Sequence, residues 1–180
     1  PEHLLCYGRL DVYQKGLDVL LEAYGRLRSR LPSPPRLVIA GRGDRDRVAA
    51  AVAASGLEGI RLEAPVDRDR VLALMGRAHA LLMPSRFEGF PVVPLEAMAA
   101  GLPVIATSVG GLAEIVPGDA GVLIPPEDAG ALTDAMTRLL GDPAALEVMS
   151  ERGRRAASRF TWDRVAARHA GFLEAVAGAG

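Results

Sequence analysis

The amino-acid sequence predicts an α/β fold with a parallel sheet of about six strands flanked by helices. Short apolar runs of strand length alternate with longer segments whose apolar residues recur every three or four positions. Strands that are separated by helices in this way form parallel sheets with right-handed crossovers. After the last apolar run the helical segments follow one another without a strand, so we expect a helical C-terminal segment.

The apolar runs have the composition of buried strands. Each is rich in leucine, valine, isoleucine or alanine and is followed by glycine, proline or a polar residue. In chain order, the predicted strands span residues 3–8, 36–41, 60–64, 80–84, 104–107 and 121–124.

The segments between and after these strands carry helix signals. The first has apolar residues at positions 17, 20, 21, 24, 27 and 31, which form one stripe of a helix. Gly56 is the expected end of the second helix, Asp67 the expected N-cap of the third, and Pro94 fits the first position of the fourth. The predicted helices span residues 17–31, 45–55, 68–77, 94–101, 129–140, 143–160 and 162–177. The whole pattern is that of a Rossmann-like sheet.

Composition restricts the ligands that this sheet can take. The chain has 180 residues and a net charge of −1, so we expect no general attraction to nucleic acid or to an anionic membrane. An anionic ligand must be held by a few placed cations, and Lys15 is the only lysine. The single cysteine, Cys6, excludes an internal disulfide and is expected to pack in a strand. No apolar run approaches the ~20 residues of a transmembrane helix.

Polar residues gather where the predicted strands end. The loops at residues 8–9, 41–43, 84–90 and 108–111 all follow strand carboxyl ends, which share one edge of a parallel sheet and bind ligands there. Glu88 and Glu96 can accept hydrogen bonds from hydroxyl groups, whereas free amides at a helix start favour anions. The sequence therefore predicts a site that binds a phosphate and a polyol at the same time.

Four segments match motifs of one enzyme family, in the expected order. Glu88 and Glu96, with seven residues between them, form an E-x7-E segment, and Arg9 with Lys15 lies in a GR…KG segment. Residues 107–116 are similar to a downstream glycine loop, and residues 160–163 to the aromatic start of a closing helix. The chain thus resembles the C-terminal, donor-binding half of retaining GT-B glycosyltransferases, the glycosyl transferases of group 1. On this resemblance, residues 1–180 form one nucleotide-sugar-binding domain.

The resemblance implies a role for each matched residue. Arg9 and Lys15 would hold the donor diphosphate, on which negative charge grows as the glycosidic bond breaks. Glu96 would accept hydrogen bonds from the ribose, and Glu88 would face the donor sugar. Pro91 stands where many relatives carry glycine and has no N–H to donate. The implied catalytic residues are Arg9, Lys15 and Glu88, and the implied donor-binding residues are these three with Gly89, Phe90, Glu96, Gly110 and Gly111.

The resemblance also implies a reaction and a partner. A sugar would pass from a nucleotide-diphosphate sugar to an acceptor held by an N-terminal domain that lies outside this chain, so the chain alone is expected to be inactive. We expect no cofactor, no metal, and a cytoplasmic location at which the missing domain could reach the inner membrane surface. The D-x-D sequences at 44–46 and 67–69 are expected to cap helices. Two alternatives stay open, a non-catalytic nucleotide-sugar-binding module and a dinucleotide-dependent oxidoreductase domain; the incomplete glycine fingerprint at 41–43 disfavours the second.

Overall fold

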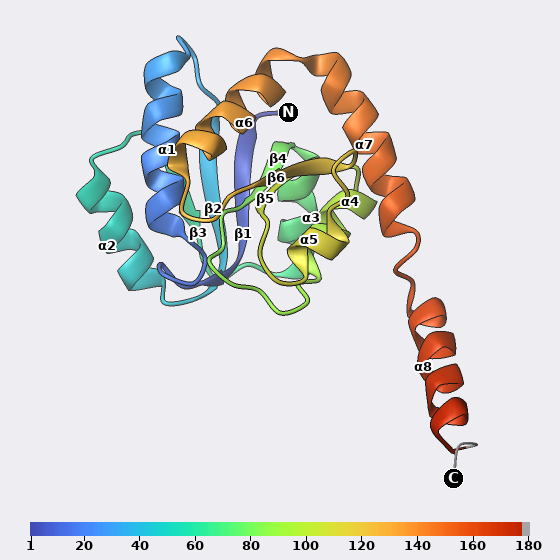
Figure 1. Ribbon diagram of the computed structural model, residues 1–180. Coiled ribbons are helices and arrows are strands. Elements are labelled where there is room, and N and C mark those ends of the chain that lie inside the picture. The colour runs from blue at the N-terminus through green and yellow to red at the C-terminus, as the bar shows by residue number, and fades with distance from the viewer. Residues whose placement is uncertain (178–180) are drawn as a thin grey trace.

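Six parallel strands form the sheet at the centre of the molecule, as predicted (Figure 1). The computed structural model describes residues 1–177. The strand order is β3-β2-β1-β4-β5-β6, so the direction of winding reverses between β1 and β4. In sheets of this kind, ligands bind at the carboxyl ends of the strands near that reversal. The strands are β1 (His3–Leu10), β2 (Arg36–Gly43), β3 (Ile60–Glu63), β4 (Ala78–Met83), β5 (Val104–Thr107) and β6 (Gly121–Ile124).

Helices cover both faces of the sheet (Figure 1). One core lies under α1, α2 and α6, and the other lies under α3, α4, α5 and α7. The last helix, α8, extends away from the body in Figure 1. None of the described helices has both the length and the apolar content that a membrane crossing requires. The helices are α1 (Leu17–Arg30), α2 (Arg45–Ser55), α3 (Arg68–Gly76), α4 (Val93–Ala99), α5 (Leu112–Ile115), α6 (Ala129–Gly141), α7 (Pro143–Ala157) and α8 (Trp162–Ala177).

Successive residues of β1 point into the two cores in turn, as expected for a strand buried on both faces. Leu4 and Cys6 belong to the core under α1, and Leu5 belongs to the opposite core. Burial raises the pKa of the Cys6 thiol to about 12. The thiol is therefore neutral at physiological pH, and the prediction that Cys6 is a packed strand residue is confirmed.

The elements agree with the prediction in type and order, with differences at a few boundaries. Strands β1 and β2 each continue two residues further than predicted, because their pairing extends to Leu10 and Gly43. Helix α7 ends at Ala157, three residues early, where hydrogen bonds of the i→i+3 type replace the helical pattern. Helix α5 was not predicted at all, since four residues are too few to show a helical period.

Two aspartates that form part of the D-x-D sequences cap helices, as predicted. The side chain of Asp44 accepts a hydrogen bond from the amide of Arg47 at 3.0 Å, at the start of α2. The side chain of Asp67 accepts one from the amide of Arg70 at 2.8 Å, at the start of α3. Both carboxylates therefore satisfy amides that a helix start leaves without partners.

His3 should make the stability of this fold depend on pH. The side chain is buried at the start of β1, and burial lowers the pKa of its imidazole below the ordinary value. The unfolded chain takes up a proton near pH 6.5 whereas the folded chain resists it, so the free energy of unfolding should fall as the pH drops below about 6.5. Urea denaturation from about pH 5 to about pH 7.5 measures this slope.

Replacing His3 by leucine should flatten the slope. Some dependence of stability on pH will remain in this variant, because burial also lowers the pKa of His79. His169, which is exposed on α8, offers the control, and His169→Gln should keep the full slope. A slope in His3→Leu as steep as that of the parent chain would contradict the assignment.

Candidate functional site

The predicted site residues lie along one edge of the sheet, where the strands end. Arg9 is near the carboxyl end of β1, and Lys15 follows it in the loop before α1. Glu88 lies in the loop between β4 and α4, and Glu96 lies in the first turn of α4. Gly110 and Gly111 lie in the loop after β5, immediately before the start of α5. The parallel sheet therefore brings together segments that are up to about a hundred residues apart in the sequence.

Lys15 and Glu88 meet directly at this edge. The Nζ atom of Lys15 lies 2.5 Å from Oε1 of Glu88, and the two side chains are 15% and 8% exposed. The hydroxyl of Ser85 donates a second hydrogen bond to the same carboxylate oxygen, at 2.7 Å. A cation and a carboxylate predicted to act on neighbouring parts of one ligand are thus already in contact.

The backbone around Gly16 explains how Lys15 reaches this position. Gly16 has φ of 59°, in the left-handed region that favours glycine. A Cβ atom at this position would lie 2.1 Å from the carbonyl oxygen of Pro84, which follows β4. Next to it, the amide of Arg86 donates to the carbonyl of Gln14 at 2.9 Å. The loop that carries Lys15 can therefore lie against the loop that carries Glu88.

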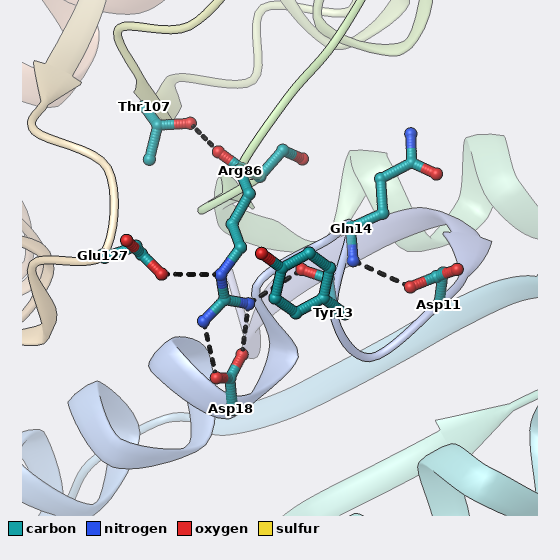
Figure 2. Close-up of polar contacts among 8 residues, drawn as sticks. Asp11, Tyr13, Gln14, Asp18, Arg86, Thr107 and Glu127 are labelled. Carbon is teal, nitrogen blue, oxygen red and sulfur yellow. Dashed lines mark hydrogen bonds and ion pairs between the residues drawn. The ribbon is translucent and has the colours of Figure 1, made fainter.

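Arg86, in the loop that carries Glu88, ties three segments of the chain together (Figure 2). Its guanidinium makes hydrogen bonds to both carboxylate oxygens of Asp18, at 2.7 and 2.9 Å, and to Glu127 at 2.8 Å. It also lies 4.5 Å from the ring centroid of Tyr13 and donates to the carbonyl of that residue. These contacts lower the pKa of Asp18 and raise that of Arg86. With four of its five N–H donors engaged within the protein, Arg86 holds the loops together.

Gly110 and Gly111 pack against the loop that bears Glu88. Gly110 has φ of 48°, and a Cβ atom there would lie 1.8 Å from the carbonyl oxygen of Glu88. The amide of Gly111 donates to the carbonyl of Gly89 at 2.8 Å. Both glycines therefore lie close to the protein's own backbone. Contact of the two glycines with a donor stays a prediction.

A row of connected hollows follows the same edge of the sheet. A narrow crevice between the ends of β1 and β4 is lined by Gly8, Arg9, Lys15 and Ser85 among others. The next hollow shares Tyr7, Gly8 and Arg9 with it, and adds Arg42. Tyr7 and Arg42 in turn line a hollow that includes Glu96. The last hollow runs from Arg42 to Ala64 and Pro65.

Arg42 is a cation that the sequence analysis did not assign. The register of β1 and β2 places it opposite Arg9, and both residues are exposed. Within residues 1–177, no carboxylate forms an ion pair with either of them. Arg42 lines three of the four hollows. Its position between two glycines at the end of the second strand was the available signal.

Phe90 reaches toward the C-terminal segment of the chain. Its ring lies 6.2 Å from the ring of Phe160, at an interplanar angle of 52°. The side chain is nevertheless 56% exposed. The expected contact of a donor with the backbone amide of Phe90 stays a prediction.

Comparison with known proteins finds a family whose members resemble this chain in sequence and in fold. The family model described as "Glycosyl transferases group 1" matches residues 1–142. The glycogen synthase of Mycobacterium tuberculosis is 38% identical over 170 residues, which cover 92% of this chain and 41% of that protein. The structure of sucrose-phosphate synthase from Thermosynechococcus elongatus superposes with a TM-score of 0.83 at 28% identity, over 99% of this chain and 46% of that one.

A third likeness concerns the fold alone. The structure of HepE from Anabaena, solved in complex with UDP, has a TM-score of 0.82 at 22% identity and covers 97% of this chain and 49% of that one. This chain therefore spans less than half the length of each of these three proteins.

Proposed function

Because this chain belongs to the glycosyl transferases of group 1, we propose that it is the donor-binding domain of a retaining glycosyltransferase. The complete protein would transfer a sugar from a nucleotide-diphosphate sugar to an acceptor. The sheet is like that of GT-B enzymes such as sucrose-phosphate synthase. The matched relatives are more than twice as long as the part that this chain covers, which supports a further domain that holds the acceptor.

The order of chemical groups along the sheet edge carries this proposal. Lys15 and Glu88 lie at one end, and Arg9 follows along the connected hollows. Glu96 comes next, and Ala64 and Pro65 lie at the far end. A nucleotide sugar has its sugar, diphosphate, ribose and base in the same order. Carboxylates that stand opposite hydroxyl-bearing parts, with cations opposite the diphosphate, match this ligand part by part.

The proposed chemistry depends chiefly on the leaving group. As the bond between the sugar and the diphosphate breaks, its electron pair moves to a phosphate oxygen. Lys15 and Arg9 would offset the growing negative charge there, in a site partly shielded from water. Glu88 would accept a hydrogen bond from a sugar hydroxyl and so hold the sugar beside the bond that breaks. The sequence-based assignments of Gly89, Phe90, Gly110 and Gly111 are retained as proposed backbone contacts.

Calorimetry tests the proposal. UDP is the first probe, because the structure of the HepE neighbour holds it; GDP, ADP and the corresponding nucleotide sugars complete the set. We expect one nucleoside diphosphate and its sugar conjugate to bind, and NAD not to bind. Transfer by this chain alone should be slight, because closure of the site requires a second domain. Binding of NAD with no binding of any nucleotide sugar would contradict the proposal.

The enzyme is favoured over a non-catalytic module. Two of the relatives above, which match this chain at 38% and 28% identity, are synthases by name. Helix α8 supports a second domain, because Phe172 and Val176 are apolar and exposed along a helix that extends away from the body. Metal independence and a cytoplasmic location stay predictions.

Glu96→Ala should weaken nucleotide binding through the ribose. Loss of a charged hydrogen bond costs about 1.5–3 kcal/mol, and we expect a loss in this range for UDP or whichever diphosphate binds. An analogue of that nucleoside diphosphate that lacks the ribose hydroxyls cannot make this hydrogen bond. It should therefore have the same affinity for the parent chain and for Glu96→Ala. Glu147→Ala, which removes an exposed acid on α7, is the matched control and should bind like the parent. An unchanged affinity in Glu96→Ala would remove Glu96 from the site.

A further inference from the structure

Ser85 is a buried hydroxyl beside the site to which neither the sequence nor the family comparison gives a role. It lies two residues after the end of β4, is only 1% exposed, and its Oγ donates to Oε1 of Glu88 at 2.7 Å. We propose that Ser85 is a positioning residue that orients the Glu88 carboxylate toward the donor sugar. This inference rests on the proposed function.

Lys15 and Ser85 both donate hydrogen bonds to the same carboxylate oxygen of Glu88. Lys15 reaches Oε1 at 2.5 Å and Ser85 reaches it at 2.7 Å. Within the described part of the chain, no side chain donates to Oε2. Fixing one oxygen of a carboxylate fixes the direction of the other, so Oε2 keeps its acceptor capacity for a sugar hydroxyl.

The sheet itself fixes Ser85. The carbonyl of Ser85 accepts a hydrogen bond from Oγ1 of Thr107 at 2.6 Å, and Thr107 is a buried residue of β5. A carboxylate on a loop is therefore connected through Ser85 to a rigid strand, which is how first contacts of a site are held in register.

Ser85 and Lys15 hold Glu88 in different ways. Lysine carries a mobile point charge on a flexible stem, and a bound diphosphate would attract it. A serine beside a strand cannot follow the ligand. When the donor enters, Ser85 therefore keeps Glu88 in place while Lys15 turns toward phosphate.

Calorimetry on this chain with three ligand pairs, UDP and UDP-glucose, GDP and GDP-mannose, and ADP and ADP-glucose, separates the sugar from the diphosphate. Ser85→Ala should lower the affinity for the nucleotide sugar about 5- to 20-fold. This is less than the roughly 10- to 150-fold effect of a charged hydrogen bond made directly to the ligand, because Ser85 acts through Glu88. The affinity for the diphosphate should stay within about twofold. Ser55→Ala is the matched control, because it removes a serine whose hydrogen bonds lie at the end of α2. It should change neither affinity.

A double-mutant cycle distinguishes positioning from a general structural role. In a Glu88→Ala background, Ser85→Ala should cause no further loss of nucleotide-sugar affinity. An equal loss in both backgrounds, or an equal loss for diphosphate and nucleotide sugar, would overturn the inference.

Failure of the proposed function is a separate result. If the parent chain binds none of the six compounds, the proposed function fails, and crystal structures of the parent chain and of Ser85→Ala decide the role of Ser85. A displaced Glu88 carboxylate in the variant would support the inference. An unmoved carboxylate would overturn it.

Discussion

Replacing Lys15 by alanine is expected to weaken nucleoside-diphosphate binding by about 1.5–3 kcal/mol, or roughly 10- to 150-fold. The substitution removes a charged hydrogen bond to phosphate. It also leaves the Glu88 carboxylate, which is 8% exposed, beside the phosphates without its cation. Both effects act in the same direction. Calorimetric titration with UDP, or with whichever diphosphate the parent chain binds, measures the loss.

Two further variants separate these contributions. Lys15→Ala combined with Glu88→Ala removes the unpaired carboxylate and should recover part of the lost diphosphate affinity. Arg26→Ala removes an exposed cation of α1 that pairs with Glu22, and should bind like the parent chain. Arg9→Ala is expected to lose affinity in the same range as Lys15→Ala. Unchanged affinity in both Arg9→Ala and Lys15→Ala would end the assignment of the diphosphate site.

Gly110→Ala is expected to lower both stability and donor affinity. Forcing a residue with a side chain into the left-handed region costs about 1–3 kcal/mol. A Cβ atom would in addition lie 1.8 Å from the carbonyl oxygen of Glu88, so the loop that carries Glu88 must move. Urea denaturation gives the loss of stability, and calorimetry below the transition gives the loss of affinity for the nucleotide sugar.

Gly118→Ala is the control for this substitution. Gly118 lies in a turn after α5, has no positive φ, and a Cβ atom there would meet nothing within 4 Å. We expect a change in stability of no more than about 0.5 kcal/mol, as for an ordinary surface site, and no change in affinity. If Gly110→Ala were as stable and bound as tightly as Gly118→Ala, the glycine contact would not position Glu88.

The secondary structure of this chain was largely readable from local signals. Strands β5 and β6 have the predicted bounds, because Pro103 and Pro125 flank four-residue apolar runs. Helix α2 also has its predicted bounds, with Asp44 at its start and Gly56 at its end. Where such markers are missing, as at the end of α7, the boundary was off by three residues.

Local signals in the sequence also predicted the positions of some site residues. Lys15, Glu88 and Glu96 stand in loops or a helix turn after apolar runs, and every such position in a parallel sheet meets at one edge. Arg42 obeys the same rule, but the only local pattern around it is an incomplete dinucleotide fingerprint, which does not predict a role for its side chain. Arg86 was overlooked because its partners, Asp18 and Glu127, lie 68 and 41 residues away.

By itself, the sequence determined which segments are strands and helices, which edge bears the polar loops, and which residue types are available there. Periodicity and turn chemistry act over a few residues, and they suffice for these features. Only the tertiary structure decided that Lys15 touches Glu88, that Ser85 shares the same oxygen, and that Gly110 lies against the Glu88 loop. Contacts between residues 73 positions apart depend on strand order and on the packing of loops. No local pattern in the sequence encodes these contacts, because they form only when the helices have packed on both faces of the sheet.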